Sequence, residues 1–153
     1  MPVLLRSEVK QTPVTLAWLK KTATALLRHA GKKHCELSIL LVDDSRMTEL
    51  NSTYRGISKP TNVLSFPMAD DPSSPAPQLL GDIVISADTA AREALDCGRT
   101  LEDHICALLV HGLVHLLGYD HERGEDDAAI MTAMEKELLL KLNDVKVLAP
   151  LAE

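Results

Sequence analysis

The sequence predicts an α+β fold, in which a small mixed sheet of four strands packs with about five helices. Short strand-like runs are interspersed with helical patterns, which is typical of a layered fold. The 153 residues suffice for one hydrophobic core and show neither an internal repeat nor a domain boundary. Hydrophobic residues make up 46% and charged residues 25%, an ordinary globular balance. We therefore expect residues 1–153 to form a single domain.

The first half of the chain predicts three strands and two helices. Thr12 as N-cap and Pro13 at the first helical position would begin the first helix, and Gly31 would end it. Residues 37–42 form a nearly continuous aliphatic run, as in a strand covered on both faces. The expected elements are a strand at residues 3–9, a helix from residue 13 to Gly31, a strand at residues 37–42, a helix from Asp43 to about Tyr54 closed by Gly56, and a strand at residues 62–66.

The second half predicts a loop, one strand and three helices. Residues 67–78 are rich in proline and small polar residues, which neither helix nor sheet absorbs. A capping box of Thr100 and Asp103 opens a strongly apolar helix that Gly118 ends. The expected elements are a strand at residues 83–86 and helices at residues 88–97, 101–117 and 126–142.

Charge, aromatic content and cysteine usage exclude several classes of protein. Sixteen basic and 22 acidic residues give a net charge of −6, which argues against a general nucleic-acid coat protein but not against a local basic groove. Aromatic residues make up only 3%, so an aromatic platform for stacked bases is not expected. The 3 cysteines lack CxxC spacing and predict free thiols. No apolar run reaches the length of a membrane span and the first ten residues show no signal-peptide core, so we expect a cytoplasmic protein without membrane contact.

The segment from residue 111 to residue 121 contains three histidines in a pattern typical of a metal site. On a helix, His111 and His115 share one face about 6 Å apart along the axis. Gly118 permits the left-handed turn that ends a helix, after which the chain can fold His121 back toward the same point. Three imidazoles with an open fourth position suit catalytic Zn²⁺. The spacing predicts one zinc ion on a central helix and the turn after it; the alternative is histidines that share a face by chance.

Neighbouring residues of this segment give weaker signals. His104 lies about 10 Å from His111 along the axis, so it cannot share the ion, and we expect a residue at the rim or surface. Zinc peptidases of the HExxH type carry a glutamate base directly after the first histidine, where this chain has Gly112. Asp120, beside a predicted ligand, either orients an imidazole through a hydrogen bond or is solvated.

Arg55 and Lys59 are candidate phosphate-binding residues. A guanidinium offers paired planar donors for a phosphate and for the extra charge of a phosphoryl transition state. Arg55 precedes Gly56 at a predicted helix end, where an arginine also interacts favourably with the helix C-terminus. Lys59 either adds attraction for phosphate or is a solvated loop residue.

The histidine segment resembles the H-G-x-L-H-L-x-G-Y-D-H signature of the YbeY family, single-strand-specific endoribonucleases of bacterial ribosomal RNA maturation. Val114 replaces the usual leucine, and Asn62 stands where the family often has aspartate. The resemblance covers about residues 36–142, and before residue 36 only the order of elements agrees. Further matches are Asn51, Tyr54 and Arg55, the run from Thr61 to Pro67, and the run from Gly81 to Ser86.

This resemblance implies a zinc-dependent endoribonuclease acting in late maturation of the 3′ end of 16S ribosomal RNA and in ribosome quality control. It implies that His111, His115 and His121 bind the ion, that His111 and Arg55 are catalytic residues, and that Arg55 acts beside the ion on the substrate. The implied partners are single-stranded ribosomal RNA, the small ribosomal subunit with one of its proteins, and an assembly GTPase. Two alternatives stay open: a metallopeptidase-like hydrolase, and a non-catalytic, zinc-stabilised ribosome-assembly factor.

Overall fold

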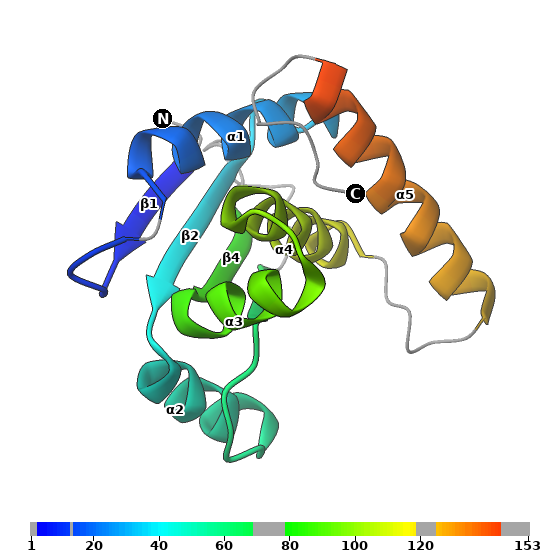
Figure 1. The fold of residues 1–153 in the computed structure, drawn as a ribbon. Coiled ribbons are helices and arrows are strands. Elements are labelled where there is room, and N and C mark those ends of the chain that lie inside the picture. The colour runs from blue at the N-terminus through cyan, green and yellow to red at the C-terminus, as the bar shows by residue number, and fades with distance from the viewer. Residues whose placement is uncertain (1–2, 13, 69–78, 119–124, 145–153) are drawn as a thin grey trace.

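The computed structural model describes residues 3–12, 14–68, 79–118 and 125–144 (Figure 1). Within these ranges the chain forms four strands and five helices. In order they are β1 (Val3–Ser7), α1 (Leu16–His29), β2 (Glu36–Val42), α2 (Asp44–Arg55), β3 (Val63–Pro67), β4 (Leu79–Ser86), α3 (Ala87–Cys97), α4 (Leu101–Leu116) and α5 (Glu125–Asp144). This is the fold class that the sequence predicts.

The strands form one mixed sheet in the order β1-β2-β4-β3. β1 and β4 run parallel to β2, whereas β3 runs antiparallel to β4. β2 therefore lies inside the sheet, with a strand on each side. Its position explains the continuous aliphatic run, because an inner strand covered on both faces needs apolar side chains in both directions.

Helices cover both faces of the sheet. On one face, Ile39 of β2 and Ile83 of β4 belong to the main core, to which α1, α4 and α5 also contribute. On the other face, Val42 and Val84 pack in a smaller cluster with Met47 of α2. Because successive side chains of a strand point to opposite faces, the apolar residues of the sheet are divided between two cores.

α4 is the central helix, as the sequence predicts. It contacts α1, α3, α5, β3 and β4, and Figure 1 shows it in the middle of the molecule with α5 on its outer side. Thr100 caps its start by accepting a hydrogen bond from the backbone N–H of Asp103 at 3.1 Å. Because a helix surrounded by other elements is apolar nearly all round, any polar side chain on it requires a specific reason.

Two element boundaries differ from the expectation by three or more residues, the starts of α1 and β4. α1 is capped by Thr15, whose hydroxyl accepts from the backbone N–H of Trp18 at 3.1 Å, rather than by Thr12. β4 begins at Leu79 rather than at residue 83, because antiparallel pairing with β3 carries Gly81 and Asp82 into the strand. Of the predicted loop, Pro67 ends β3, and residues 69–78 lie outside the described residues. No described helix is both long and apolar enough to cross a membrane.

Candidate active site

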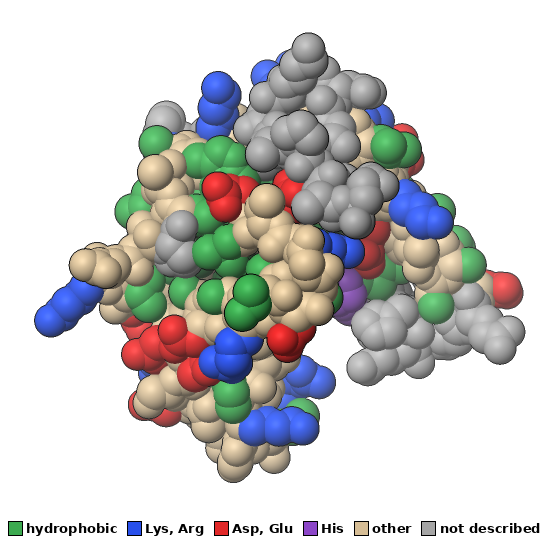
Figure 2. Space-filling view, viewed as in Figure 1, with side chains coloured by type: hydrophobic (Ala, Val, Ile, Leu, Met, Phe, Trp, Pro, Cys, Tyr) green, Lys and Arg blue, Asp and Glu red, His purple; other side chains and the backbone are tan. Residues whose placement is uncertain are grey.

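α4 presents the two predicted histidines along its partly exposed stripe. Ala107, His111 and His115 are half-buried, whereas the residues between them on the helix are buried. In Figure 2 a histidine surface is visible in a notch beside acidic and basic side chains. The spacing of four residues therefore brings both imidazoles to the one side of α4 that the neighbouring elements leave partly open.

The two imidazoles lie against each other. Their ring centroids are 4.7 Å apart, and the ring planes meet at 82°. At this separation one nitrogen of each ring can reach a shared ion at about 2.0–2.1 Å, the usual Zn–N distance. The prediction that His111 and His115 share one face is confirmed, and the pair fits two ligands of a zinc ion.

Two predicted site residues, Asp120 and His121, lie outside the described residues. The chain approaches them through Gly118, whose φ of 101° is the positive value predicted for the turn that ends the helix. Among the residues that the structure describes, no three histidine, cysteine, aspartate or glutamate side chains are grouped to hold a metal ion. The described part of the predicted centre is therefore the pair His111 and His115.

α5 adds a carboxylate that the sequence reasoning missed. Oε1 of Glu135 lies 3.1 Å from Nδ1 of His111. Because a carboxylate accepts hydrogen bonds, the ring is assigned the tautomer with its proton on Nδ1, which leaves the Nε2 lone pair for a metal. Histidine ligands of metal ions usually make such a hydrogen bond through their second nitrogen.

Gly112 brings α4 close to the sheet. A Cβ at this position would lie 3.1 Å from Oγ of Ser65 and 3.2 Å from two side-chain carbons of Ile83. Ser65 also donates a hydrogen bond to the carbonyl of Gly112 at 3.3 Å. Position 112 thus faces β3 and β4, whereas His111 and His115 belong to the partly exposed stripe of the helix.

Arg55 and Lys59 lie at the end of α2 and in the segment after it. Arg55 is the last residue of the helix, before Gly56 with φ 70°, and the side chains of both basic residues are exposed. Asn51 holds the segment in place by donating to the carbonyl of Lys59 at 2.9 Å. The two basic residues thus come from α2 and the segment after it, whereas the two histidines come from α4.

His104 is buried rather than placed at a rim or surface. Its exposed fraction is 8%, and its Nε2 lies 2.9 Å from Oε1 of Glu93 on α3. Asn62 donates to the same carboxylate oxygen at 3.1 Å. The three side chains thus link α3, α4 and the start of β3. The expectation of a rim position was wrong, because α3 packs over this end of α4.

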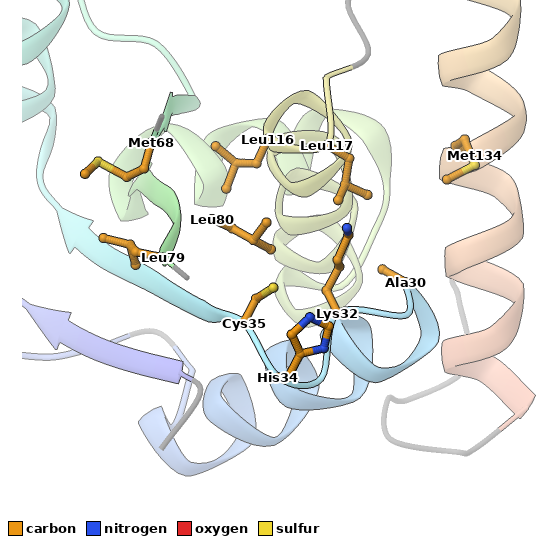
Figure 3. A pocket seen from close by; sticks show the side chains of 10 residues that line it. All are labelled: Ala30, Lys32, His34, Cys35, Met68, Leu79, Leu80, Leu116, Leu117 and Met134. Carbon is orange, nitrogen blue, oxygen red and sulfur yellow. The ribbon is translucent and has the colours of Figure 1, made fainter. Parts of the chain in front are cut away.

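A pocket of about 430 Å³ opens near the C-terminal end of α4 (Figure 3). Leu116, Leu117 and Met134 form much of its apolar wall, and Lys32 and His34 reach it from the segment before β2. None of the predicted site residues in the described part of the chain lines it. The pocket is therefore a separate feature beside the histidine pair.

The cysteines take no part in the described site. All three are free, as predicted from their spacing. Cys106 lies on α4 but is fully buried, and burial, reinforced by the charge of Asp103, raises the pKa of its thiol far above the ordinary value. A thiol held protonated is neither a nucleophile nor a metal ligand.

The family model and the curated relatives that match this chain carry the same family name. The family model described as Endoribonuclease YbeY matches residues 6–143. Curated proteins named Endoribonuclease YbeY are similar to this chain. The one from Aquifex aeolicus is 43% identical over 136 residues, covering 89% of each chain, and the one from Acinetobacter baumannii is 48% identical over 132 residues, covering 83% of each.

A solved structure supports the fold. The solution structure of a Thermotoga maritima protein superposes with a TM-score of 0.63 and covers 94% of this chain and 91% of its own. The two sequences share 23% identity, so this likeness bears on the fold alone.

Proposed function

This chain belongs to the endoribonuclease YbeY family, and on that premise we propose that it hydrolyses phosphodiester bonds in single-stranded RNA with one zinc ion held by His111, His115 and His121. The observation that carries the proposal is the pair of imidazoles 4.7 Å apart on the half-buried stripe of a buried helix. Two histidines in such a place cost burial energy, and metal binding is a chemical reason for that cost.

The residues of this chain have distinct roles in the proposed reaction. His111 and His115 provide nitrogen ligands from a rigid helix, and His121 provides the third from the turn after it. A bound zinc ion supplies Lewis acidity toward a phosphoryl oxygen and toward water. Asp120 would orient the His121 ring, the role that carboxylates next to ligating histidines often have.

Arg55 and Lys59 would act on the phosphate backbone. Both side chains are exposed in one short segment that Asn51 anchors through the Lys59 carbonyl. We assign Arg55 to the charge that develops on the phosphoryl group and Lys59 to attraction of the neighbouring phosphates. Because Arg55 would contact phosphate in the bound substrate as well as in the transition state, its removal should weaken both binding and turnover.

The proposed substrate is ribosomal RNA, at the 3′ end of 16S ribosomal RNA during late maturation and quality control. A net charge of −6 opposes the binding of free RNA, which supports a substrate presented by a partner. We propose the small ribosomal subunit as that partner, with one of its proteins and an assembly GTPase as further contacts.

The packing of Gly112 favours a nuclease over a peptidase. A zinc peptidase of the HExxH type needs a glutamate base at this position. Here the position faces Ser65 and Ile83, with no room even for a Cβ at ordinary contact distance. The glutamate-based mechanism therefore has no counterpart in α4.

Replacing His115 by alanine tests the proposal. We expect the zinc content of purified His115→Ala protein to fall to background, and cleavage of an unstructured RNA to be lost with it, because the site loses one of three ligands. Metal analysis and a cleavage assay on single-stranded and duplex RNA measure the two quantities. His34→Ala, which removes an exposed histidine, is the matched control and should keep both.

The outcomes separate the alternatives. Cleavage of RNA that persists in the His115→Ala protein would overturn the mechanism. The non-catalytic assembly factor would be indicated by two results together. The wild-type protein would cleave neither RNA nor an unstructured peptide, and the His115→Ala protein would lose both its zinc and its folded state.

A further inference from the structure

Glu135 on α5 contacts the candidate metal centre from a second helix. Its Oε1 lies 3.1 Å from Nδ1 of His111, and the two side chains are 28% and 33% exposed. Both are therefore partly shielded from solvent, where a hydrogen bond to a charged group is stronger than at the surface.

The position of Glu135 on its helix is unusual for a charged residue. Met131, Leu138 and Leu142 are nearly completely buried in the main core, and Glu135 shares their face of α5 at helical spacing. A glutamate at such a position is costly unless it has a partner. Its partner is His111. The buried residues on the same face of α5 therefore hold the helix in place and keep the carboxylate next to the histidine.

We propose that Glu135 is a positioning residue for the metal centre, an inference that rests on the proposed function. The carboxylate accepts the Nδ1–H hydrogen bond of His111, which fixes the tautomer and the rotation of the ring and directs the Nε2 lone pair to the ion. A ligand held in its binding orientation loses less freedom when the metal binds. Glu135 thereby raises the affinity of the site for zinc without touching the ion.

Glu137 is a matched control on the same helix. It is exposed and pairs with Lys141 at 3.1 Å, on the solvent side of α5. Glu137→Gln removes the same charge as Glu135→Gln from a position two residues away. It therefore reports what the loss of one negative charge does by itself.

The experiment measures zinc affinity of the full chain by competition with a chromophoric chelator after the metal has been stripped. We expect Glu135→Ala to weaken zinc binding by roughly 10- to 100-fold, the usual effect of losing such a partner. Glu135→Gln, whose amide oxygen still accepts from Nδ1–H, should lose less, and Glu137→Gln should bind as the wild type does.

Three outcomes decide the question. A zinc affinity of Glu135→Ala and Glu135→Gln within twofold of the wild type would overturn the positioning role while leaving the proposed function intact. Equal loss in Glu137→Gln would assign the effect to net charge and would also overturn it. A wild-type chain that binds no zinc would overturn the proposed function itself. If Glu135→Ala does not fold, Glu135→Gln alone is compared with the wild type, and a zinc affinity within twofold of the wild type would overturn the positioning role.

Discussion

At the scale of single residues, Gly112 determines how closely α4 approaches the sheet. Glycine inside a helix costs about 1 kcal/mol relative to alanine, so a packing reason is expected for it. That reason is the close contact with Ile83, which is fully buried in the main core. An added methyl group in such a place costs about 1–3 kcal/mol, which equals or exceeds the gain of about 1 kcal/mol in helix propensity.

We therefore expect Gly112→Ala to lower the free energy of unfolding by about 1 kcal/mol. Urea unfolding measures the change. Ile83→Val shortens the side chain that the new methyl group meets, so in the double variant the combined loss should be smaller than the sum of the single losses. A stabilised Gly112→Ala protein, or strictly additive losses, would contradict the close packing.

Single residues could be predicted where the sequence pattern around them was sufficient to place them. His111 and His115 were predictable because their spacing alone places them on one helix face. The role of Glu135 depends on how α5 packs against α4, which no local pattern specifies. The signal available was a charge at helical spacing from Met131 and Leu138. The prediction of a rim position for His104 was wrong for a similar reason. Its burial depends on how α3 packs against α4, which no local pattern specifies either.

At the scale of elements, the starts of α2 and α3 are joined through one carboxylate. Asp44 accepts hydrogen bonds from Ser86 at 2.7 Å and Thr89 at 2.6 Å, and forms an ion pair with Arg92 at 2.8 Å. Burial alone would raise the pKa of Asp44, but these three partners together lower it. The network orients α2, and with it Arg55 at the other end of that helix.

This shift predicts a pH-dependent contribution to stability. The folded pKa of Asp44 lies below its unfolded value of about 3.9, so its contribution is present above about pH 4 and is lost as the pH falls through the folded pKa. We expect Asp44→Asn to be less stable than the wild type by about 1 kcal/mol at neutral pH, and the difference to shrink below about pH 4.

Urea unfolding at a series of pH values measures that difference. Asp96→Asn, which changes an exposed aspartate on α3, is the control and should follow the wild type. A deficit of Asp44→Asn that is equally large in acid and at neutral pH would contradict the role of the ionised carboxylate.

The sequence predicted helix ends better than strand ends. Asp43 and Gly56 bound α2, and Thr100 caps α4, where the expected cap residues lie. Those signals are local, because a cap satisfies the backbone groups of its own helix. The start of β4 was missed because Gly81 and Asp82 read as loop residues, and their place in the strand depends on pairing with β3.

At the scale of the whole molecule, the net charge of −6 opposes the approach of RNA. Binding must then depend on a local group of cations strong enough to outweigh the overall repulsion. Arg55 and Lys59 are the proposed group, at the C-terminal end of α2 and in the segment after it.

The salt dependence of RNA binding tests this distribution of charge. Each phosphate contact on a single strand contributes about 0.7 to the slope of log K against log salt concentration, because a bound counterion is released. Removing two such contacts in the Arg55→Ala, Lys59→Ala double variant should therefore flatten the slope by about 1.4. Fluorescence anisotropy of a labelled single-stranded RNA at several salt concentrations measures it. Lys21→Ala, an exposed lysine on α1, should leave the slope unchanged. An equal change in both proteins would mean that RNA senses the overall charge of the molecule rather than the end of α2.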